Sequence, residues 1–229
     1  METRLKTIVC LPAYNAEKTL ERTFLSIPEK FHNDIILVDD FSKDRTIELS
    51  QKLGILTLSH ARNKGYGANQ KSCYKIALAC GADIIVMLHP DFQYVGEDIP
   101  SLIYPIIRKK KDMMLGSRIR NARNDGMPLW KYFSNRGLTI IEKIVLRNLE
   151  LHEFHSGFRA SSRRLLESID FLSFNDDFSF DSQMIFSALK KGFRIGEIDT
   201  RTRYFNEASS IDFKKASKYA WLTMYLLLR

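Results

Sequence analysis

Two acidic segments contain the side chains of this sequence that could do chemistry. Asp39 and Asp40 follow an apolar run at residues 35–38, and the segment His-Pro-Asp-Phe-Gln at residues 89–93 follows another apolar run. Two adjacent carboxylates repel each other unless cations or hydrogen-bond donors lie near them. The pattern therefore predicts a site for a nucleotide and a divalent cation. Helix capping alone would also explain Asp39 and Asp40.

Asp91 is the first candidate metal ligand, and His89 and Gln93 can add a nitrogen and an oxygen. Mg²⁺ and Mn²⁺ prefer carboxylate and phosphate oxygens, so such a site forms together with a bound diphosphate. The cation would offset the charge that builds on a leaving nucleoside diphosphate. We therefore expect Mg²⁺ or Mn²⁺ as the cofactor. The alternative is that His89 only hydrogen-bonds nearby and that Asp91 alone holds the metal.

The elements that must position these residues alternate between strand and helix in the first half of the chain. Apolar runs predict buried strands at residues 7–11, 34–39, 55–58 and 83–88, and helical periodicity predicts helices at 17–27, 44–53, 68–80 and 98–108. This alternation is typical of an α/β fold with a doubly wound, mostly parallel sheet flanked by helices. Ligands of such sheets bind at the carboxyl ends of the strands. Both acidic segments are expected at that edge.

The second half of the chain is less regular. Helices are predicted at 130–149, from 158 through Leu165 and Leu166, at 180–190 and at 212–228, and a strand is predicted at 193–198. The apolar end of the last helix is far shorter than the roughly 20 residues that span a bilayer. It either packs on the domain or lies at a membrane interface. We expect residues 1–229 to form a single domain.

The composition limits the classes of partner. The formal net charge is +8, which fits a basic surface, an anionic membrane face or a phosphate-bearing substrate. No RNP sequence, zinc-finger spacing or helix-turn-helix is present, so nucleic acid is not expected. The three cysteines form no Cys-x-x-Cys pair, as is typical of a reducing compartment. No signal peptide opens the chain, so we expect a cytoplasmic location, including the inner face of the membrane.

Several basic residues stand apart from any charge run. Arginine makes bidentate contacts with phosphate oxygens, and arginines near irregular segments predict an anionic ligand. The arginines of this kind are Arg118, Arg136, Arg159 and Arg203. Lys64 can reach a diphosphate, although a solvated lysine is the commoner outcome. The Gly-Tyr-Gly turn at 65–67 is followed by Gln70, where the dinucleotide fingerprint needs glycine, which argues against a Rossmann dehydrogenase.

Five segments in order resemble glycosyltransferase family 2, specifically its dolichyl-phosphate mannose synthase-like branch. They are VCLPAYNAE at 9–17, VDDFSKD at 38–44, NKGYGA at 63–68, GSR at 116–118 and SGFR at 156–159. The resemblance covers nearly the whole chain. It implies a GT-A fold and an inverting transfer of a hexose from a UDP- or GDP-linked sugar. It divides the chain into a nucleotide-sugar-binding half, 1–118, and an acceptor-side half, 119–229.

The resemblance also implies roles for individual residues. The base and ribose would be held by Pro12, Tyr14, Asn15 and Asp39, with Asp40 and Lys64 on the same nucleotide side. Asp91 and Gln93 would hold the metal and diphosphate, and Arg203 would belong to a loop that closes over the donor. The phosphates of donor or acceptor would meet Arg118, Arg136 and Arg159. The family usually has Asp-x-Asp where this chain has His89, which removes a negative charge and leaves the metal affinity open.

The acceptor decides whether a catalytic base is needed. A polyprenyl phosphate is already anionic near neutral pH, because its second pKa is about 6, so it needs no base. A glycan hydroxyl needs a carboxylate within hydrogen-bond reach. Asp181 occupies about the place where hydroxyl-transferring relatives keep their base, and Asp176 and Asp177 are weaker rivals. Asp181 can equally be a favourable carboxylate at a helix N-terminus.

Three other functions remain in competition. The chain can transfer sugar to a soluble hydroxyl acceptor, or it can be a binding or scaffold protein that has lost turnover through His89. A nucleotidyltransferase is the third, but it should carry a glycine-rich, lysine-bearing loop directly after the first strand. This chain has Pro-Ala-Tyr-Asn at 12–15 there, which argues against that class.

Overall fold

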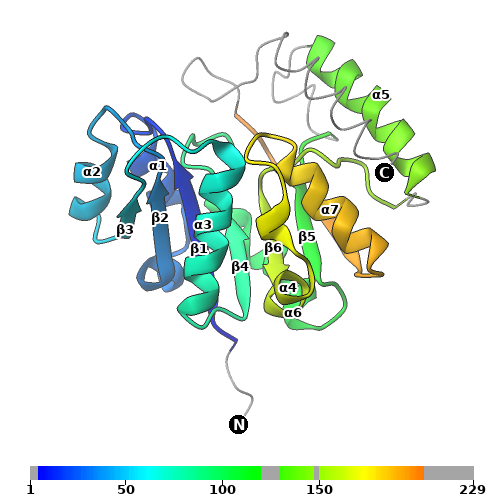
Figure 1. Ribbon diagram of the computed structural model, residues 1–229, viewed down its shortest axis with the longest axis horizontal. Coiled ribbons are helices and arrows are strands. Elements are labelled where there is room, and N and C mark those ends of the chain that lie inside the picture. The colour runs from blue at the N-terminus through cyan, green and yellow to red at the C-terminus, as the bar shows by residue number, and fades with distance from the viewer. Residues whose placement is uncertain (1–4, 120–128, 147–149, 204–229) are drawn as a thin grey trace.

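The computed structural model describes residues 5–119, 129–146 and 150–203, and these form one sheet with helices on both faces (Figure 1). The strands are β1 (Thr7–Ala13), β2 (Ile35–Asp39), β3 (Leu56–Ser59), β4 (Ile84–Met87), β5 (Met113–Ser117), β6 (Arg159–Ser162) and β7 (Ile195–Asp199). The α-helices are α1 (Leu20–Ser26), α2 (Thr46–Lys52), α3 (Tyr66–Ala79), α4 (Ile99–Ile107), α5 (Leu129–Val145), α6 (Arg163–Ser168) and α7 (Phe180–Lys190). Short 3₁₀ helices are η1 (Glu29–Asp34), η2 (Gly96–Asp98) and η3 (Phe171–Ser173).

The sheet has the strand order β3-β2-β1-β4-β6-β5-β7. β1 pairs in parallel with both β2 and β4. Successive residues of a strand point to opposite faces, so Ile8 and Cys10 join one core while Val9 and Leu11 join the other. A strand covered on both faces needs an apolar residue at each position, which explains the continuous apolar run in the sequence.

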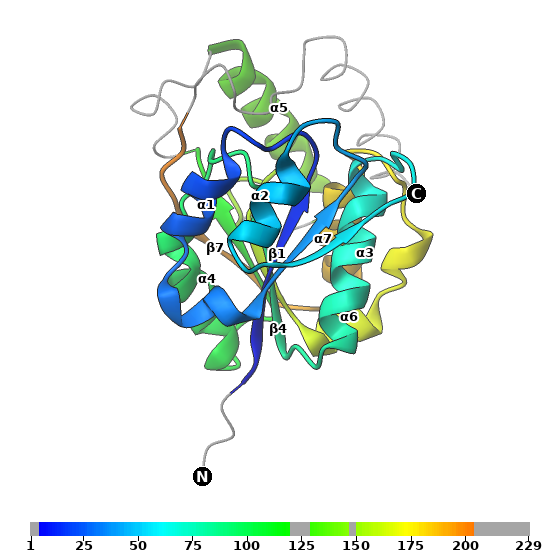
Figure 2. The same cartoon turned by 90° about the vertical axis from the view of Figure 1, so that its left-hand side faces the viewer.

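Helices cover both faces of the sheet, as the side view shows (Figure 2). α3, α6 and α7 pack on one face, where Tyr74, Leu165 and Met184 are fully or almost fully buried. α1 and α4 pack on the other, where Leu20 and Leu102 are fully buried. The prediction of a doubly wound, mostly parallel sheet flanked by helices is therefore confirmed.

Two strands, β5 and β6, were not predicted from the sequence. β6 was expected to be the beginning of a helix, but it is a four-residue strand that runs antiparallel to both β4 and β5. Its sequence, Arg-Ala-Ser-Ser, contains no β-branched or aromatic residue, so local propensity gives no strand signal. Pairing with its two neighbours decides its conformation. Ser162 then caps α6 by accepting a hydrogen bond from the backbone of Leu165.

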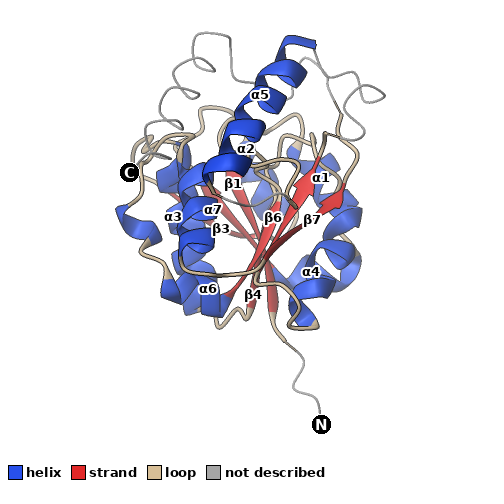
Figure 3. Ribbon diagram, turned by 90° about the vertical axis from the view of Figure 1, so that its right-hand side faces the viewer, coloured by secondary structure: helices blue, strands red, loops and turns tan. Residues whose placement is uncertain are grey.

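The parallel strands β1, β2 and β4 end at Ala13, Asp39 and Met87. Parallel pairing brings these ends to one edge of the sheet, and α5 lies above that edge (Figure 3). The two acidic segments, at residues 39–40 and 89–93, therefore lie at the edge of the sheet where the sequence predicted them. Within the described part of the chain, no helix combines the length and apolarity that crossing a bilayer requires. The helix predicted at 212–228 lies outside the described residues.

Candidate active site

A pocket of about 430 Å³ opens at the carboxyl edge of the sheet, where β1 and β4 end. It brings together segments that follow the four strands β1, β2, β3 and β4 and the loop before α7. Its lining residues are Pro12, Ala13, Tyr14, Asn15, Ala16, Thr19, Asp40, Asn63, Gly65, Tyr66, Asn69, His89, Pro90, Asp91, Asp176, Asp177 and Phe178. Six of the predicted site residues are in this set: Pro12, Tyr14, Asn15, Asp40, His89 and Asp91.

The turn after β1 presents an aromatic ring to the pocket. Tyr14 is 55% exposed, which leaves its ring open to stack on a planar ligand. Asn15 adopts a left-handed backbone conformation with φ 50°, which asparagine tolerates better than most residues. Its backbone N–H donates to Ser42 Oγ at 2.8 Å, and its side-chain oxygen accepts from Lys43 N at 2.9 Å. Asn15 therefore joins the turns after β1 and β2.

Asp39 lies beneath the pocket surface. Its side chain is fully buried, and its carboxylate accepts hydrogen bonds from Ser42 N at 2.9 Å and Ser59 Oγ at 3.2 Å, as well as from the Ser42 hydroxyl. It does not line the pocket. In this arrangement Asp39 organises the turn after β2, and its contact with a nucleotide stays a prediction.

The Asp40 carboxylate binds the loop that precedes α3. Its carboxylate accepts from Lys64 N at 2.8 Å and Gly65 N at 2.9 Å, and it pairs with His60 Nδ1 at 2.7 Å. The two neighbouring aspartates thus have separate sets of donors, which explains how both are buried side by side. The Lys64 residue is exposed and does not line the pocket, so its reach to a diphosphate stays a prediction.

The loop at 63–67 packs tightly against residues 175–176. Gly67 N donates to Asp176 O at 2.7 Å. A Cβ added at Gly67 would lie 2.4 Å from Asn175 O, and one added at Gly65, where φ is 100°, would lie 2.7 Å from Asp176 O. Only glycine fits such a close approach of two backbones. The Gly-Tyr-Gly turn therefore serves backbone packing beside the pocket.

His89 is held on several sides. Its Nε2 lies 3.0 Å from Tyr66 Oη, and the two rings stack with centroids 5.1 Å apart. A Cβ at Gly157 would lie 2.8 Å from the imidazole, so that glycine makes room for the ring. Burial lowers the pKa of His89, and the carboxylates of Asp91 and Asp181 oppose this less strongly. The imidazole is therefore neutral at physiological pH, with one nitrogen already facing Tyr66.

Among the described residues, Asp91 is the predicted carboxylate ligand at the pocket, and the ligand roles of His89 and Gln93 stay predictions. In the described ranges no three His, Cys, Asp or Glu side chains gather into a metal cluster. Asp91 lines the pocket, and one of its oxygens accepts from Gln93 N at 3.0 Å. Gln93 is buried and is not a lining residue. One carboxylate completed by phosphate oxygens and water is a common way to hold Mg²⁺. The donor set thus fits a cation that arrives with a diphosphate.

Asp181 and Arg159 form a buried ion pair behind the pocket. Arg159 is fully buried, and its Nη2 lies 2.5 Å from Asp181 Oδ1. Asp181 also accepts from Gln70 Nε2 at 2.9 Å and, on its other oxygen, from Tyr66 Oη at 2.7 Å. Burial by itself lowers the pKa of Arg159, but the Asp181 carboxylate and the hydroxyls of Tyr74 and Tyr66 bring it above its ordinary value. These two predicted catalytic residues therefore bind each other.

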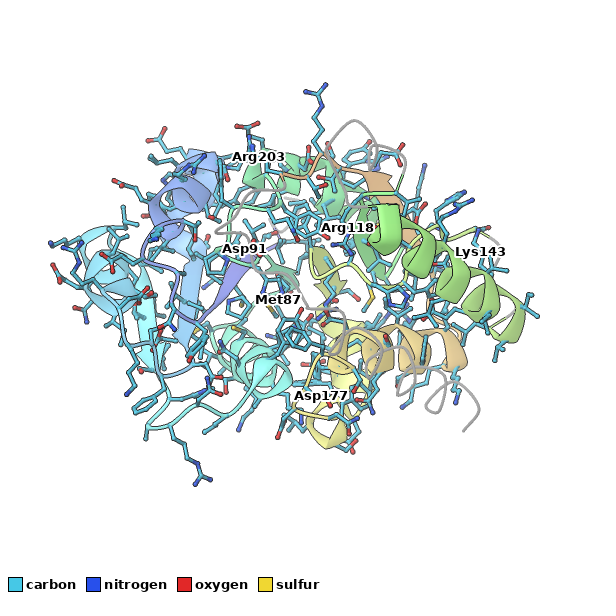
Figure 4. The ribbon with its side chains drawn as sticks, turned by 90° about the horizontal axis from the view of Figure 1, so that it is seen from above. Met87, Asp91, Arg118, Lys143, Asp177 and Arg203 are labelled. Carbon is cyan, nitrogen blue, oxygen red and sulfur yellow. The ribbon has the colours of Figure 1, made fainter. Side chains whose placement is uncertain are left out.

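The other predicted arginines lie in different surroundings. Arg118 donates through its backbone N and Nε to the buried carboxylate of Glu153, at 2.7 and 2.6 Å. Arg136 is exposed on α5. Arg203 is exposed, and its guanidinium lies over the ring of Phe92. Seen from above, Asp91 and Arg203 lie on one side of the site, Asp177 lies across from them, and Lys143 on α5 lies apart (Figure 4).

Sequence reasoning missed the partners that hold these side chains. Tyr66 and Gln70 both reach Asp181, and their spacing of four residues on α3 places them on one helix face, a signal that the sequence did carry. Glu153 lies 35 positions from Arg118, in a segment with no regular pattern. Nothing local points to that pair.

Comparisons with known proteins agree with this fold and these motifs. The family model described as Glycosyl transferase family 2 matches residues 8–170. A UDP-N-acetylglucosamine–dolichyl-phosphate N-acetylglucosaminyltransferase from Methanococcus voltae is 31% identical over 212 residues, covering 85% of this chain and 84% of that protein. A dolichol-phosphate mannosyltransferase from Pyrococcus furiosus is 27% identical over 175 residues, covering 72% of this chain and 49% of that protein.

Solved structures show the same architecture. Glucosyl-3-phosphoglycerate synthase from Mycobacterium tuberculosis, in complex with Mn²⁺ and UDP-glucose, superposes with a TM-score of 0.75 at 18% identity, covering 98% of this chain and 78% of that one. At this identity the likeness concerns the fold alone. The fold is of the GT-A type, as the resemblance implied.

Proposed function

The chain belongs to glycosyltransferase family 2, and we infer that it transfers a hexose, with inversion, from a UDP- or GDP-linked sugar to a polyprenyl phosphate. Similar proteins support the acceptor, because the relatives from Methanococcus voltae and Pyrococcus furiosus are named as transferases to dolichyl phosphate. The donor class is supported by the pocket, whose exposed Tyr14 ring and acidic Asp91 suit a base and a metal-bound diphosphate.

The hydrogen bonds and the ion pair of Asp181 are the observation that favours a phosphate acceptor over a hydroxyl acceptor. A base that activates a hydroxyl must be free to accept its proton. Both Asp181 oxygens already accept hydrogen bonds, and the neighbouring Arg159 cation stabilises the ionised carboxylate. Arg159, Gln70 and Tyr66 therefore already occupy the carboxylate oxygens that a base would offer to a hydroxyl. A phosphate acceptor brings its own negative charge and needs no such group.

The rival carboxylates at the pocket also have partners. Asp176 pairs with Lys71 Nζ at 2.7 Å. Asp177 accepts from Ser179 N at 2.9 Å and from Ser179 Oγ at 2.6 Å, at the start of α7. The first contact joins α3 to the loop before α7, and the second stays within that loop. They support the same conclusion, that the pocket serves a nucleophile that is already ionised.

The remaining roles follow from this chemistry. Asp91 would hold Mg²⁺ or Mn²⁺ together with the diphosphate, and the cation would stabilise the departing nucleoside diphosphate. Tyr14 and the turn at 12–15 would orient the base and ribose, so that the sugar carbon faces the acceptor. Residues 1–118 would thus bind the donor and residues 119–229 would face the acceptor. Because a polyprenyl chain stays in the bilayer, we place the reaction at the cytoplasmic membrane surface, where a net charge of +8 favours anionic lipids.

The decisive experiment offers the enzyme three acceptors in parallel. Purified protein is incubated with UDP-N-acetylglucosamine or GDP-mannose, Mn²⁺ or Mg²⁺, and either a polyprenyl phosphate, the matching polyprenol or a soluble oligosaccharide. Mass spectrometry should detect a glycosylated lipid phosphate and neither of the other products. Product on the polyprenol or oligosaccharide alone would contradict the proposed acceptor. Donor binding without any product would instead favour a binding or scaffold role.

A further inference from the structure

Phe92 has an unusual backbone conformation directly beside the candidate metal ligand. Its φ is 56°, in the left-handed region that a bulky side chain rarely adopts. The hydrogen bond from Gln93 N to Asp91 Oδ1 closes a tight turn around it. Such conformations are strained and persist where the surroundings hold them, often at ligand sites. The turn directs the aromatic ring of Phe92 toward two other parts of the chain.

Two arginine side chains lie over this ring. The guanidinium carbon of Arg22, from α1, is 4.4 Å from the ring centroid, and that of Arg203, after β7, is 4.2 Å away. Both distances are within the range of a cation–π interaction. Arg22 and Arg203, which are more than 100 positions apart in the sequence, thus both contact the ring of Phe92. We name this group of Arg22, Phe92 and Arg203 the Phe92 clamp.

The backbone fastens the same two segments. Arg203 N donates to Gln93 O at 2.9 Å, and Tyr94 forms an antiparallel bridge with Thr202. Arg203 is therefore held to the segment that carries Asp91 through its main chain as well as its side chain. Its guanidinium contacts the ring of Phe92, the residue that follows Asp91 in the sequence. Asp91 and Arg203 are both labelled in the view from above (Figure 4).

A cation–π contact has a different consequence from an ion pair. Arg118 and Arg159 use their N–H groups on the carboxylates of Glu153 and Asp181. In Arg203 the ring of Phe92 contacts the guanidinium itself, while the N–H donors, which lie in the guanidinium plane, stay available to anionic oxygens. Among the described residues, no carboxylate pairs with Arg203.

We propose that Phe92 is a positioning residue, which holds the guanidinium of Arg203 beside Asp91 to bind the diphosphate of the donor. This rests on the proposed function, since it assumes a nucleoside diphosphate in the pocket. Phe92 is not among the residues that line the pocket, so its ring would act through Arg203 and not on the substrate itself. It acts by restricting Arg203 before the ligand arrives, which lowers the entropy cost of binding.

The test measures the affinity for UDP and for GDP, each with Mn²⁺, by calorimetry. Phe92→Leu should lower the affinity for the nucleotide that the wild type binds more tightly by about two- to thirtyfold, which is the range of a cation–π contact. Phe92→Tyr keeps the aromatic face and should bind like the wild type. In an Arg203→Gln background, Phe92→Leu should change the affinity less than twofold, because the group that it positions is gone. Phe92→Met allows the same comparison if Phe92→Leu does not fold.

The outcomes separate this proposal from the proposed function. If the wild type binds neither UDP nor GDP, both are overturned. If the wild type binds but Phe92→Leu binds equally well, only the positioning role is overturned. An equal loss from Phe92→Leu with and without Arg203 would also overturn it, because a general disturbance of the pocket would act in both backgrounds.

Discussion

Replacing Asp181 by asparagine should destabilise the protein strongly, because it leaves the charge of Arg159 unpaired. Arg159 is fully buried, and Asp181 is the carboxylate that its guanidinium contacts, at 2.5 Å. The change Asp181→Asn keeps the shape of the side chain and an oxygen that can accept a hydrogen bond. It removes the negative charge and replaces one accepting oxygen with an NH₂ donor, so the charge and one accepted hydrogen bond are lost together.

The size of the effect follows from the cost of an uncompensated buried charge. Removing one partner of a buried ion pair typically costs about 3–5 kcal/mol. Because the asparagine oxygen still accepts a hydrogen bond, we expect the lower end, about 3 kcal/mol. For a domain of this size, that loss lowers the melting temperature by roughly 6–12 °C. Adding Arg159→Met should recover part of the loss, because the buried charge is then absent.

The assay is urea unfolding followed by circular dichroism, with Asp170→Asn as the matched control. Asp170 is exposed after α6, so this control should change the unfolding free energy by less than about 0.5 kcal/mol. A loss below about 1 kcal/mol for Asp181→Asn would refute the reasoning. So would a double variant with Arg159→Met that is less stable than Asp181→Asn alone.

Three further predictions concern the pocket and α5. Gly67→Ala should destabilise the protein by about 1–3 kcal/mol in urea unfolding, because its Cβ would meet Asn175 O at 2.4 Å, whereas Gly137→Ala, with nothing within 4 Å, should be neutral or stabilising. Burial lowers the pKa of His155, but the ion pair with Glu142 outweighs this and raises the pKa overall. The ion pair therefore stabilises the fold fully below about pH 6.5, and this stabilisation is lost as the pH rises through the raised pKa of His155. The difference in unfolding free energy between wild type and Glu142→Gln should accordingly shrink between pH 6 and pH 9, and a constant difference would contradict the pair. Asp91→Asn should make the affinity for UDP or GDP insensitive to Mn²⁺ and EDTA in calorimetry, and an unchanged metal dependence would remove Asp91 from that role.

Much of the first half could be predicted because its signals are local. A buried parallel strand needs an unbroken apolar run, so β1, β2 and β4 are visible in the sequence by themselves. The helix predicted at 180–190 has the same bounds in the structure, since helical periodicity begins at Phe180 and Gly192 follows with φ 77°. The order of the strands then places the acidic segments at one edge.

The sequence by itself therefore determined the fold class, the family resemblance and the edge of the sheet where the site lies. Only the tertiary structure decided what each charged side chain does there. The same residue type, arginine, is paired with Glu153 at position 118, with Asp181 at position 159, and lies over Phe92 at position 203. These partners come from segments far apart in the chain, and burial, which sets the strength of an ion pair, exists only once the segments have packed together.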